Sequence, residues 1–249
     1  MYCFFYTSSA PPGHLPLKGK ARKIFMDLKE IAHINTGFTQ KFGIPRQSGL
    51  VSEIGHIVFE PEFRNPTFID GITDYDYLWL IWGFSKNKPL EGGTVRPPRL
   101  GGQKHMGVFA TRAPFRPNNI GLSSVELIEV QETAEYGPVL VVSGVDMLDG
   151  TPIYDIKPYI PYADAHPEAR GGFTDDLSKG AQVKVDFPQE LLQKLPEEIR
   201  DSAVELLGQD PRAGYDRGKQ RDFRLAYHGY DIVFLGKDGE ITVTDVLKI

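Results

Sequence analysis

The chain has very little cysteine and no long apolar run, and each absence excludes a class of protein. Cys3 is the single cysteine among 249 residues, which excludes an intrachain disulfide framework and a cysteine-rich zinc site. No apolar stretch approaches the roughly 20 residues that span a bilayer. The apolar start at residues 1–6 is short and follows no positive residue, unlike a secretory signal. We therefore expect a cytoplasmic protein without a membrane segment.

Several signatures of nucleotide and metal sites are missing as well. There is no Gly-x-x-x-x-Gly-Lys-[Ser/Thr] phosphate loop and no metalloprotease helix. The glycine pairs at 92–93 and 101–102 do not lie between a strand and a helix in a Gly-x-Gly-x-x-Gly pattern. The sequence therefore predicts neither a metal site nor a doubly wound nucleotide-binding fold.

Positive charge is scarce in total but concentrated in one segment. The formal net charge is −5 at pH 7, which by itself argues against a nucleic-acid partner. Screening confines electrostatic interactions to about 10 Å, so a local cluster can still bind phosphate. The segment 86–116 contains one acidic residue, Glu91, and the basic residues Lys86, Lys88, Arg96, Arg99, Lys104, Arg112 and Arg116. A solvated surface loop is the alternative interpretation of such a run.

The pattern between residues 31 and 162 predicts β-structure. Short runs rich in Val, Ile and aromatic residues, separated by Gly, Pro and Asp, lie at residues 56–60, 77–82, 124–130 and 139–145. Residues 78–82 (LWLIW) are apolar throughout, so we expect them to be buried on both faces. Short strands without long intervening helices indicate an antiparallel barrel or sandwich.

The remaining segments differ in composition. Residues 1–30 have the composition of an N-terminal extension, and we expect residues 1–25 to be dispensable. Residues 163–185 lack periodicity and predict a linker. Apolar residues at helical spacing follow between 192 and 206, divided by Pro196, and three short strands lie between 221 and 247. The expected fold is mainly β: an N-terminal antiparallel β-barrel domain (31–162) followed by a small α+β C-terminal domain (186–249).

Three segments mix proline and glycine with charged and amide residues: 43–49, 95–121 and 148–159. Proline fixes the backbone, and glycine lets the backbone approach a ligand closely. One such loop would be an ordinary connection, but three that carry charges indicate a site. Two alternatives stay open here. Asp155 and Lys157 share one strand face and can form a purely structural ion pair, and Tyr159 can stack on a base or simply pack.

At these segments the sequence resembles the TsaA-like family, also called the YaeB or TrmO family. Its members include the tRNA methyltransferase that acts on threonylcarbamoyladenosine. The resemblance covers about residues 31–162 and recurs at 210–215 (DPRAGY). Its most specific parts are 109–121 (FATRAPFRPNNIG) and 149–159 (DGTPIYDIKPY), because both are long and unusual in composition.

The resemblance implies a β-barrel that binds S-adenosylmethionine without a metal, in a homodimer that holds the cofactor near the subunit interface. The implied substrate is N6 of threonylcarbamoyladenosine, next to the anticodon of a threonine tRNA. A module that binds S-adenosylmethionine without transferring its methyl group is one alternative function. An RNA-binding protein without catalysis is the other.

The resemblance also implies roles for individual residues. The cofactor site would comprise Pro45, Arg46, Gln47, Arg112, Arg116, Leu148, Asp149, Gly150, Thr151 and Lys157. Asp155 or Tyr159 would accept the proton lost from N6. From their charge and their place beside Gly-rich turns, we expect Lys86, Lys88 and Lys104 to contact tRNA. Arg212 and Tyr215 belong to the stretch similar to the family's C-terminal motif, which would help RNA binding or complete the site. Many members have histidines near positions 77 and 85, where this chain has Tyr77 and Ser85, so we do not expect histidine-based catalysis.

Overall fold

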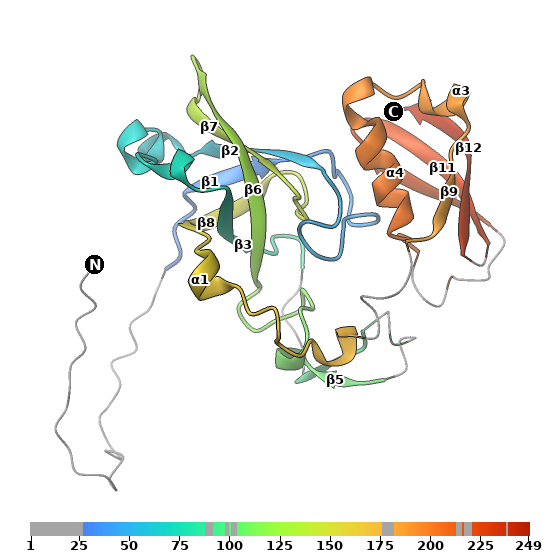
Figure 1. Ribbon diagram of the computed structural model, residues 1–249, viewed down its shortest axis with the longest axis horizontal. Helices are drawn as coiled ribbons and strands as arrows, with labels where there is room; N and C mark the ends of the chain where they lie inside the picture. The colour runs from blue at the N-terminus through green and yellow to red at the C-terminus, as the bar shows by residue number, and fades with distance from the viewer. Residues whose placement is uncertain are drawn as a thin grey trace, which may run out of the picture.

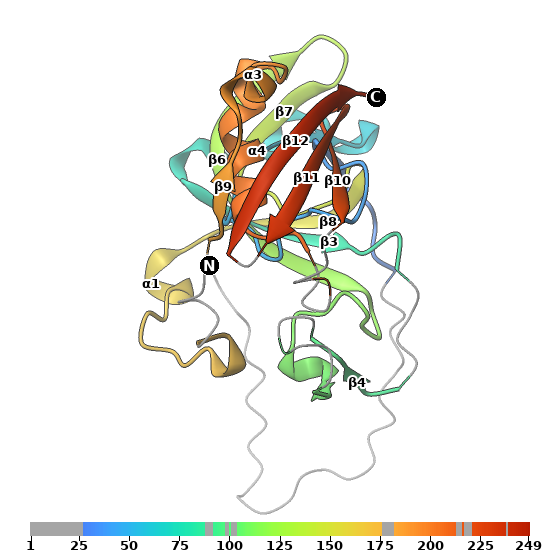
Figure 2. The ribbon, with the colours of Figure 1, turned by 90° about the vertical axis from the view of Figure 1, so that its right-hand side faces the viewer.

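The computed structural model describes residues 27–87, 92–97, 100, 104–175, 182–212, 216, 221–237 and 239–249. Two β-sheets are its main parts, and both are visible in Figures 1 and 2. Within the described residues no helix is long and apolar enough to cross a membrane. Residues 1–26, Lys88 and Tyr215, for which the sequence made predictions, lie outside the described residues.

The first sheet is a closed ring of six antiparallel strands. Its members in chain order are β1 (Ala32–Asn35), β2 (Ile54–Phe59), β3 (Tyr77–Gly83), β6 (Ile120–Thr133), β7 (Gly137–Ser143) and β8 (Thr151–Pro158). Around the ring the order is β1-β2-β7-β6-β3-β8, and β8 pairs with β1 again. Closure leaves no strand with an unpaired edge. The expectation of mainly β structure with antiparallel pairing between residues 31 and 162 is confirmed.

Strand β3 shows how alternation fills the ring. Leu78, Leu80 and Trp82 are buried in the interior, whereas Trp79 and Ile81 are only half-buried. The expectation that residues 78–82 are buried on both faces is therefore wrong for the single chain. Successive strand residues point to opposite faces, and in the single chain the outer face of β3 is only partly covered.

Short elements connect the strands of the ring. Strands β4 (Thr94–Val95) and β5 (Met106–Gly107) pair within the basic segment. Helix α1 (Pro161–Asp164) follows directly after β8. The described 3₁₀ helices between strands of the ring are η1 (Pro61–Phe63), η2 (Pro66–Phe68), η3 (Ile72–Asp74) and η5 (Val108–Ala110). The 3₁₀ helices η6 (Gly172–Thr174) and η7 (Glu197–Ile199) follow the ring.

The second sheet is built from the C-terminal part of the chain. Strands β10 (Asp222–Tyr227), β11 (Tyr230–Lys237) and β12 (Glu240–Lys248) are antiparallel, and β9 (Lys184–Asp186) runs parallel to β12. The predicted linker 163–185 is thus too long, because its last residues belong to this sheet. Helices α3 (Gln189–Leu192) and α4 (Arg200–Gly208) lie against the sheet (Figure 2). The predicted helical spacing is confirmed by the buried side chains of Leu195, Ile199, Ala203 and Leu206.

The two sheets meet around a buried carboxylate. Glu53 is 1% exposed and accepts hydrogen bonds from the backbone N–H of Gly37 (2.8 Å), from His228 Nε2 (3.0 Å) and from the Tyr227 hydroxyl. The Tyr227 oxygen also lies 2.6 Å from Ser202 Oγ. These contacts join the ring to the C-terminal sheet, and both contribute to one hydrophobic cluster. The division into domains at 31–162 and 186–249 stays a prediction.

Candidate functional site

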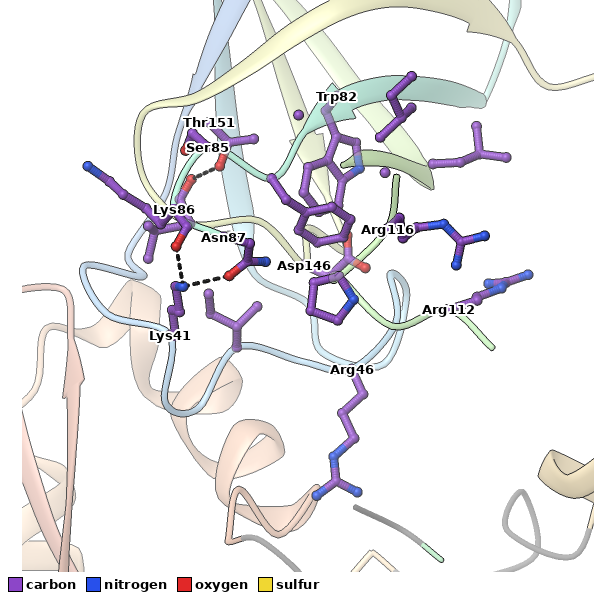
Figure 3. Close-up of a pocket in the computed structure, with 18 of the residues that line it drawn as sticks. Lys41, Arg46, Trp82, Ser85, Lys86, Asn87, Arg112, Arg116, Asp146 and Thr151 are labelled. Atoms are coloured by element: carbon purple, nitrogen blue, oxygen red, sulfur yellow. Dashed lines mark hydrogen bonds between the residues drawn. The ribbon is translucent and has the colours of Figure 1, made fainter. Parts of the chain in front are cut away.

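A cavity of about 610 Å³ opens at one end of the ring (Figure 3). Its volume falls within the roughly 300–1,000 Å³ typical of small-molecule sites. It is lined by residues 44–47, by parts of 111–116, and by Asp146, Leu148 and Thr151. Each of the three segments rich in proline, glycine and charge therefore contributes to one cavity, although they are far apart in the sequence.

One wall of the cavity is aromatic. The rings of Trp82 and Phe84 lie 4.3 Å apart at an angle of 60°, and Phe115, Ile120 and Leu122 extend the apolar surface. Trp82 reaches this position because residue 121 is glycine. A Cβ on Gly121 would overlap the indole ring. Such a wall suits a planar, largely apolar group such as a nucleobase.

The charged rim of the cavity is held by hydrogen bonds between the motif segments. Arg112 donates to Gln47 Oε1, and Gln47 Nε2 donates to the carbonyl of Arg46. Arg46 Nη2 in turn donates to the carbonyl of Arg212, 3.3 Å away in the C-terminal part of the chain. Arginines fixed in this way present planar donors suited to a carboxylate or phosphate.

Two further cations are tied to backbone carbonyls at the same end of the ring. Arg116 Nη1 donates to the carbonyls of Thr111 (2.8 Å) and Val108 (3.2 Å), which closes the loop ahead of β6. Lys41 Nζ donates to the carbonyl of Lys86 (2.6 Å) and to Oδ1 of Asn87 (2.6 Å), as Figure 3 shows. Arg116 therefore has a structural role, because it holds the loop at residues 108–111.

Asp146 is the only carboxylate among the described residues that line the cavity. Ser123 Oγ donates to its Oδ1 at 2.6 Å, and the indole Nε1 of Trp82 donates to Ser123 Oγ at 3.0 Å. Burial raises the pKa of Asp146 to about 6, although the hydrogen bond from Ser123 and the charge of Arg112 oppose the shift. Asp146 was not predicted from the sequence. The available signal was its place two residues before the 148–159 motif.

Most of the residues predicted to bind the cofactor lie around this cavity. Those that line it are Pro45, Arg46, Gln47, Arg112, Arg116, Leu148 and Thr151. Asp149, Gly150 and Lys157 are not lining residues. Asp149 Oδ1 instead accepts the backbone N–H of Thr36 (3.0 Å), and Gly150 has φ +70° in the turn before β8. These two residues therefore shape the turn that places Leu148 and Thr151. The third motif is also less of a loop than expected, because Thr151–Pro158 is strand β8.

The two predicted proton acceptors are not among the residues that line the cavity. Asp155 pairs with Lys157 at 2.7 Å, and both side chains are about half exposed. The ion pair that the sequence offered as one alternative is thus present. Tyr159 packs against Trp79 (ring centroids 5.7 Å apart) and Tyr77 (6.2 Å). Neither residue is among those that line the cavity.

The predicted tRNA-binding residues are divided between surface and interior. Lys86 is exposed on the cavity rim, and Lys104 is exposed just before β5. Arg212, in contrast, is 2% exposed and pairs with Asp210 at 2.7 Å. Its guanidinium is therefore enclosed by protein, and its role in RNA binding stays a prediction.

The cavity lining is a poor donor set for a metal ion, because it offers one carboxylate and no histidine or cysteine. Elsewhere, the described residues include one group with ligand atoms within 4.8 Å of one another: Glu30, His33 and Glu60. That group lies at the start of the ring and is not among the lining residues of the cavity.

Comparison with known proteins defines the class to which this ring and cavity belong. The model of the tRNA-methyltransferase O N-terminal domain matches residues 33–165, a span that contains every lining residue of the cavity. The chain therefore belongs to this family.

Individual relatives and a solved structure agree with the family. The tRNA (adenine(37)-N6)-methyltransferase of Escherichia coli K12 is 36% identical over 216 residues, covering 82% of this chain and 90% of the relative. A Pseudomonas aeruginosa protein described as a putative S-adenosylmethionine-dependent methyltransferase, RcsF, is 39% identical over 209 residues, or 78% and 87% of the two chains. A crystal structure of TrmO from P. aeruginosa superposes with a TM-score of 0.70 at 30% identity, covering 90% of this chain and 97% of the other.

Proposed function

We propose that the chain transfers a methyl group from S-adenosylmethionine to N6 of the adenosine at position 37 of a tRNA. One observation carries the proposal: Arg46, Arg112 and Leu148, from three separate segments of the matched family region, line a single cavity. The relative from E. coli, which bears the name of this activity, aligns with 82% of the chain.

The cavity fits S-adenosylmethionine by its chemistry. The aromatic wall of Trp82 and Phe84 suits the adenine ring, and the guanidinium groups of Arg46 and Arg112 suit the carboxylate of the methionine part. The Asp146 carboxylate can accept a hydrogen bond from an N–H group of a bound molecule or pair with a positive charge on it. When bound, this cofactor supplies an electrophilic methyl group, so the main task of the protein is to position the nucleophile.

For the substrate we propose N6 of threonylcarbamoyladenosine in a threonine tRNA. Bases of an anticodon loop are unstacked and can enter a protein cavity. The exposed lysines Lys86 and Lys104 lie on the same basic segment as Arg112 and are suited to contact the tRNA backbone. A cytoplasmic location, where tRNA is found, is part of this proposal.

Mass spectrometry of tRNA nucleosides tests the function directly. The protein is incubated with methyl-labelled S-adenosylmethionine and with tRNA that carries threonylcarbamoyladenosine but lacks the methyl group. We expect the label on the N6 group of that nucleoside. A tight cofactor complex that yields no product would instead indicate a binding module. RNA binding that is insensitive to the cofactor and yields no product would indicate an RNA-binding protein.

We further propose that the chain forms a homodimer through the outer face of β3 and β6. On this face Leu122 is 56% exposed and Tyr77 45%, beside the half-buried Trp79. Since Trp79 and Leu122 also line the cavity, a partner on this face would lie at the cavity mouth. Light scattering at micromolar concentration should report a dimer.

Two variants test this interface. Leu122→Glu should shift the protein to a monomer, because it places a charge in the proposed apolar contact. Leu235→Glu is the matched control, since Leu235 is 41% exposed on the C-terminal sheet. A monomeric parent protein, or a Leu122→Glu variant that remains a dimer, would refute the proposed interface.

A further inference from the structure

The proposed reaction needs a group that removes a proton. N6 of threonylcarbamoyladenosine is bonded to the purine ring and to a carbonyl, and both withdraw its lone pair, so the neutral nitrogen is a poor nucleophile. A general base close to N6 and ionised at neutral pH would overcome this. The two acceptors expected from the sequence, Asp155 and Tyr159, do not line the cavity.

The charged groups around the cavity leave one candidate. The ionisable residues that line it are Lys41, Arg46, Lys86, Arg112, Arg116 and Asp146. The first five are cations, which have no free lone pair to accept a proton at neutral pH. The described lining residues include no histidine, tyrosine or cysteine. Asp146 is therefore the one side chain in the cavity with the chemistry of a base.

Hydrogen bonds orient the Asp146 carboxylate. An indole N–H can only donate, so Ser123 Oγ accepts from Trp82 Nε1 (3.0 Å) and directs its own hydrogen at Asp146 Oδ1 (2.6 Å). Ser123 is 2% and Trp82 5% exposed, so packing fixes this arrangement. The backbone N–H of Ser48 also donates to the carboxyl group. Ser123 and the backbone N–H groups of Ser48 and Asp146 thus hold the carboxylate in place.

We infer that the Asp146 carboxylate accepts the N6 proton during methyl transfer and that Ser123 positions it for this step. The inference rests on the proposed function. The N6–H bond breaks, its proton goes to the Asp146 carboxylate, and its electron pair remains on N6. That pair forms the new bond to the methyl carbon as the bond from carbon to sulfur breaks. The pair of the broken bond stays on sulfur, which becomes neutral.

The environment of Asp146 matches this task. Burial raises its pKa to about 6, so at neutral pH the carboxylate is ionised and is a stronger base than an exposed aspartate. Arg112 acts in the opposite direction and keeps the ionised form accessible. With the other cations of the rim, it would also stabilise negative charge that develops on N6.

Asp146→Asn tests the inference, because asparagine keeps the size of the side chain and removes its basicity. Asp70→Asn, an exposed position outside the cavity, is the control for the same chemical change. At saturating tRNA and cofactor we expect kcat to fall roughly 10²- to 10⁴-fold in Asp146→Asn and to stay unchanged in the control. Binding of S-adenosylhomocysteine, measured by calorimetry, should change only a few-fold.

The pH dependence provides a second readout. In the parent protein kcat should fall as pH drops through about 6, where Asp146 becomes protonated, and this acid limb should be absent in Asp146→Asn. Ser123→Ala removes a hydrogen bond that lowers the pKa of Asp146, so its acid limb should move to higher pH. Carbon-13 NMR of labelled aspartate in the free protein should show a carboxyl group that titrates near pH 6, and it should be missing in Asp146→Asn.

The possible failures can be distinguished. An Asp146→Asn variant with parental kcat, or one that loses only affinity for S-adenosylhomocysteine, would overturn the assignment while the parent enzyme remains active. A comparable loss of kcat in Asp155→Asn, with Asp146→Asn intact, would give the role to Asp155. A parent protein that makes no product from the modified tRNA would overturn the proposed function and this inference together.

Discussion

Arg46 and Arg112 occupy the cavity rim with their side chains already held by protein contacts. Arg112 binds Gln47, and Arg46 binds the carbonyl of Arg212. Side chains that are fixed before a ligand arrives lose less freedom on binding. A hydrogen bond to a charged group contributes about 1.5–3 kcal/mol. Arg46→Ala or Arg112→Ala should therefore weaken S-adenosylmethionine binding by roughly 10- to 150-fold, as measured by calorimetry.

The control for this experiment is Lys248→Ala, at an exposed position on the C-terminal sheet. Its affinity for the cofactor should equal that of the parent. Parental affinity in both arginine variants would show that these residues do not contact the cofactor.

At the scale of residues, the sequence predicted the parts of the site that lie in continuous motifs. Arg46, Arg112, Leu148 and Thr151 line the cavity as expected from their segments. Asp146 could not be recognised in the same way, because its role depends on Ser123, 23 positions earlier, and on the indole of Trp82. Spacing along the chain does not reveal a contact that only the closure of the ring creates.

At the scale of elements, the strands with clear β-composition were predicted, and those interrupted by polar or proline residues were not. Strands β3 and β7 fall within about two residues of the runs at 77–82 and 139–145. Strand β8 was treated as part of a loop motif because it contains Pro152, Asp155, Lys157 and Pro158. Its pairing with both β1 and β3 provides the backbone hydrogen bonds that local propensity does not predict.

The contact between the ring and strand β10 gives a prediction at this scale. The Tyr227 hydroxyl bonds both Glu53 and Ser202 in the interior. Tyr227→Phe leaves the Glu53 carboxylate with fewer donors, so unfolding in urea at pH 7 should show a loss of about 1.5–3 kcal/mol. Tyr230→Phe is the matched control, since the Tyr230 hydroxyl makes no hydrogen bond within the described residues. Equal stability of the two variants would contradict the prediction.

The same tyrosine predicts how stability depends on alkaline pH. Burial, together with the Glu53 carboxylate, raises the pKa of Tyr227 well above its usual value of 10.0. Because the folded state holds this proton more tightly than the unfolded chain, the parent protein should lose stability as pH rises above 10.0. Tyr227→Phe has no proton to lose there, so its stability should fall less over the same range. Urea unfolding across a pH series measures the difference.

At the scale of the whole molecule, the C-terminal part of the chain contacts the rim of the cavity. Arg212 is enclosed and paired with Asp210, and its carbonyl receives the hydrogen bond from Arg46 at the cavity. Arg212, in the 210–215 motif that the resemblance linked to RNA binding or to completion of the site, therefore contacts the rim residue Arg46. Only the three-dimensional structure separates these roles, because a buried arginine and an exposed one have the same appearance in the sequence. Solvent-exposed cations are therefore the side chains that we expect to contact tRNA.

The basic segment should accordingly divide between tRNA and the cofactor cavity. Lys86 and Lys104 are exposed and carry the flexible point charge suited to phosphate. Replacing either with alanine should weaken tRNA binding and reduce the slope of log affinity against log salt by roughly one unit or less. Arg112→Ala should instead impair methyl transfer and leave most tRNA binding intact. Arg116→Ala should do the same, because its guanidinium holds the carbonyls of the loop at 108–111.

Filter binding across a salt series, combined with a methyl-transfer assay on each variant, separates the two groups of residues. Lys248→Ala again serves as the control, because it removes an exposed lysine from the C-terminal sheet, away from the basic segment. Cofactor affinity should be unchanged in Lys104→Ala, since Lys104 does not line the cavity. A parental salt slope in both Lys86→Ala and Lys104→Ala would mean that the segment is a solvated loop. The tRNA would then have to dock on other exposed cations, such as Arg221 and Arg224, beside and within β10.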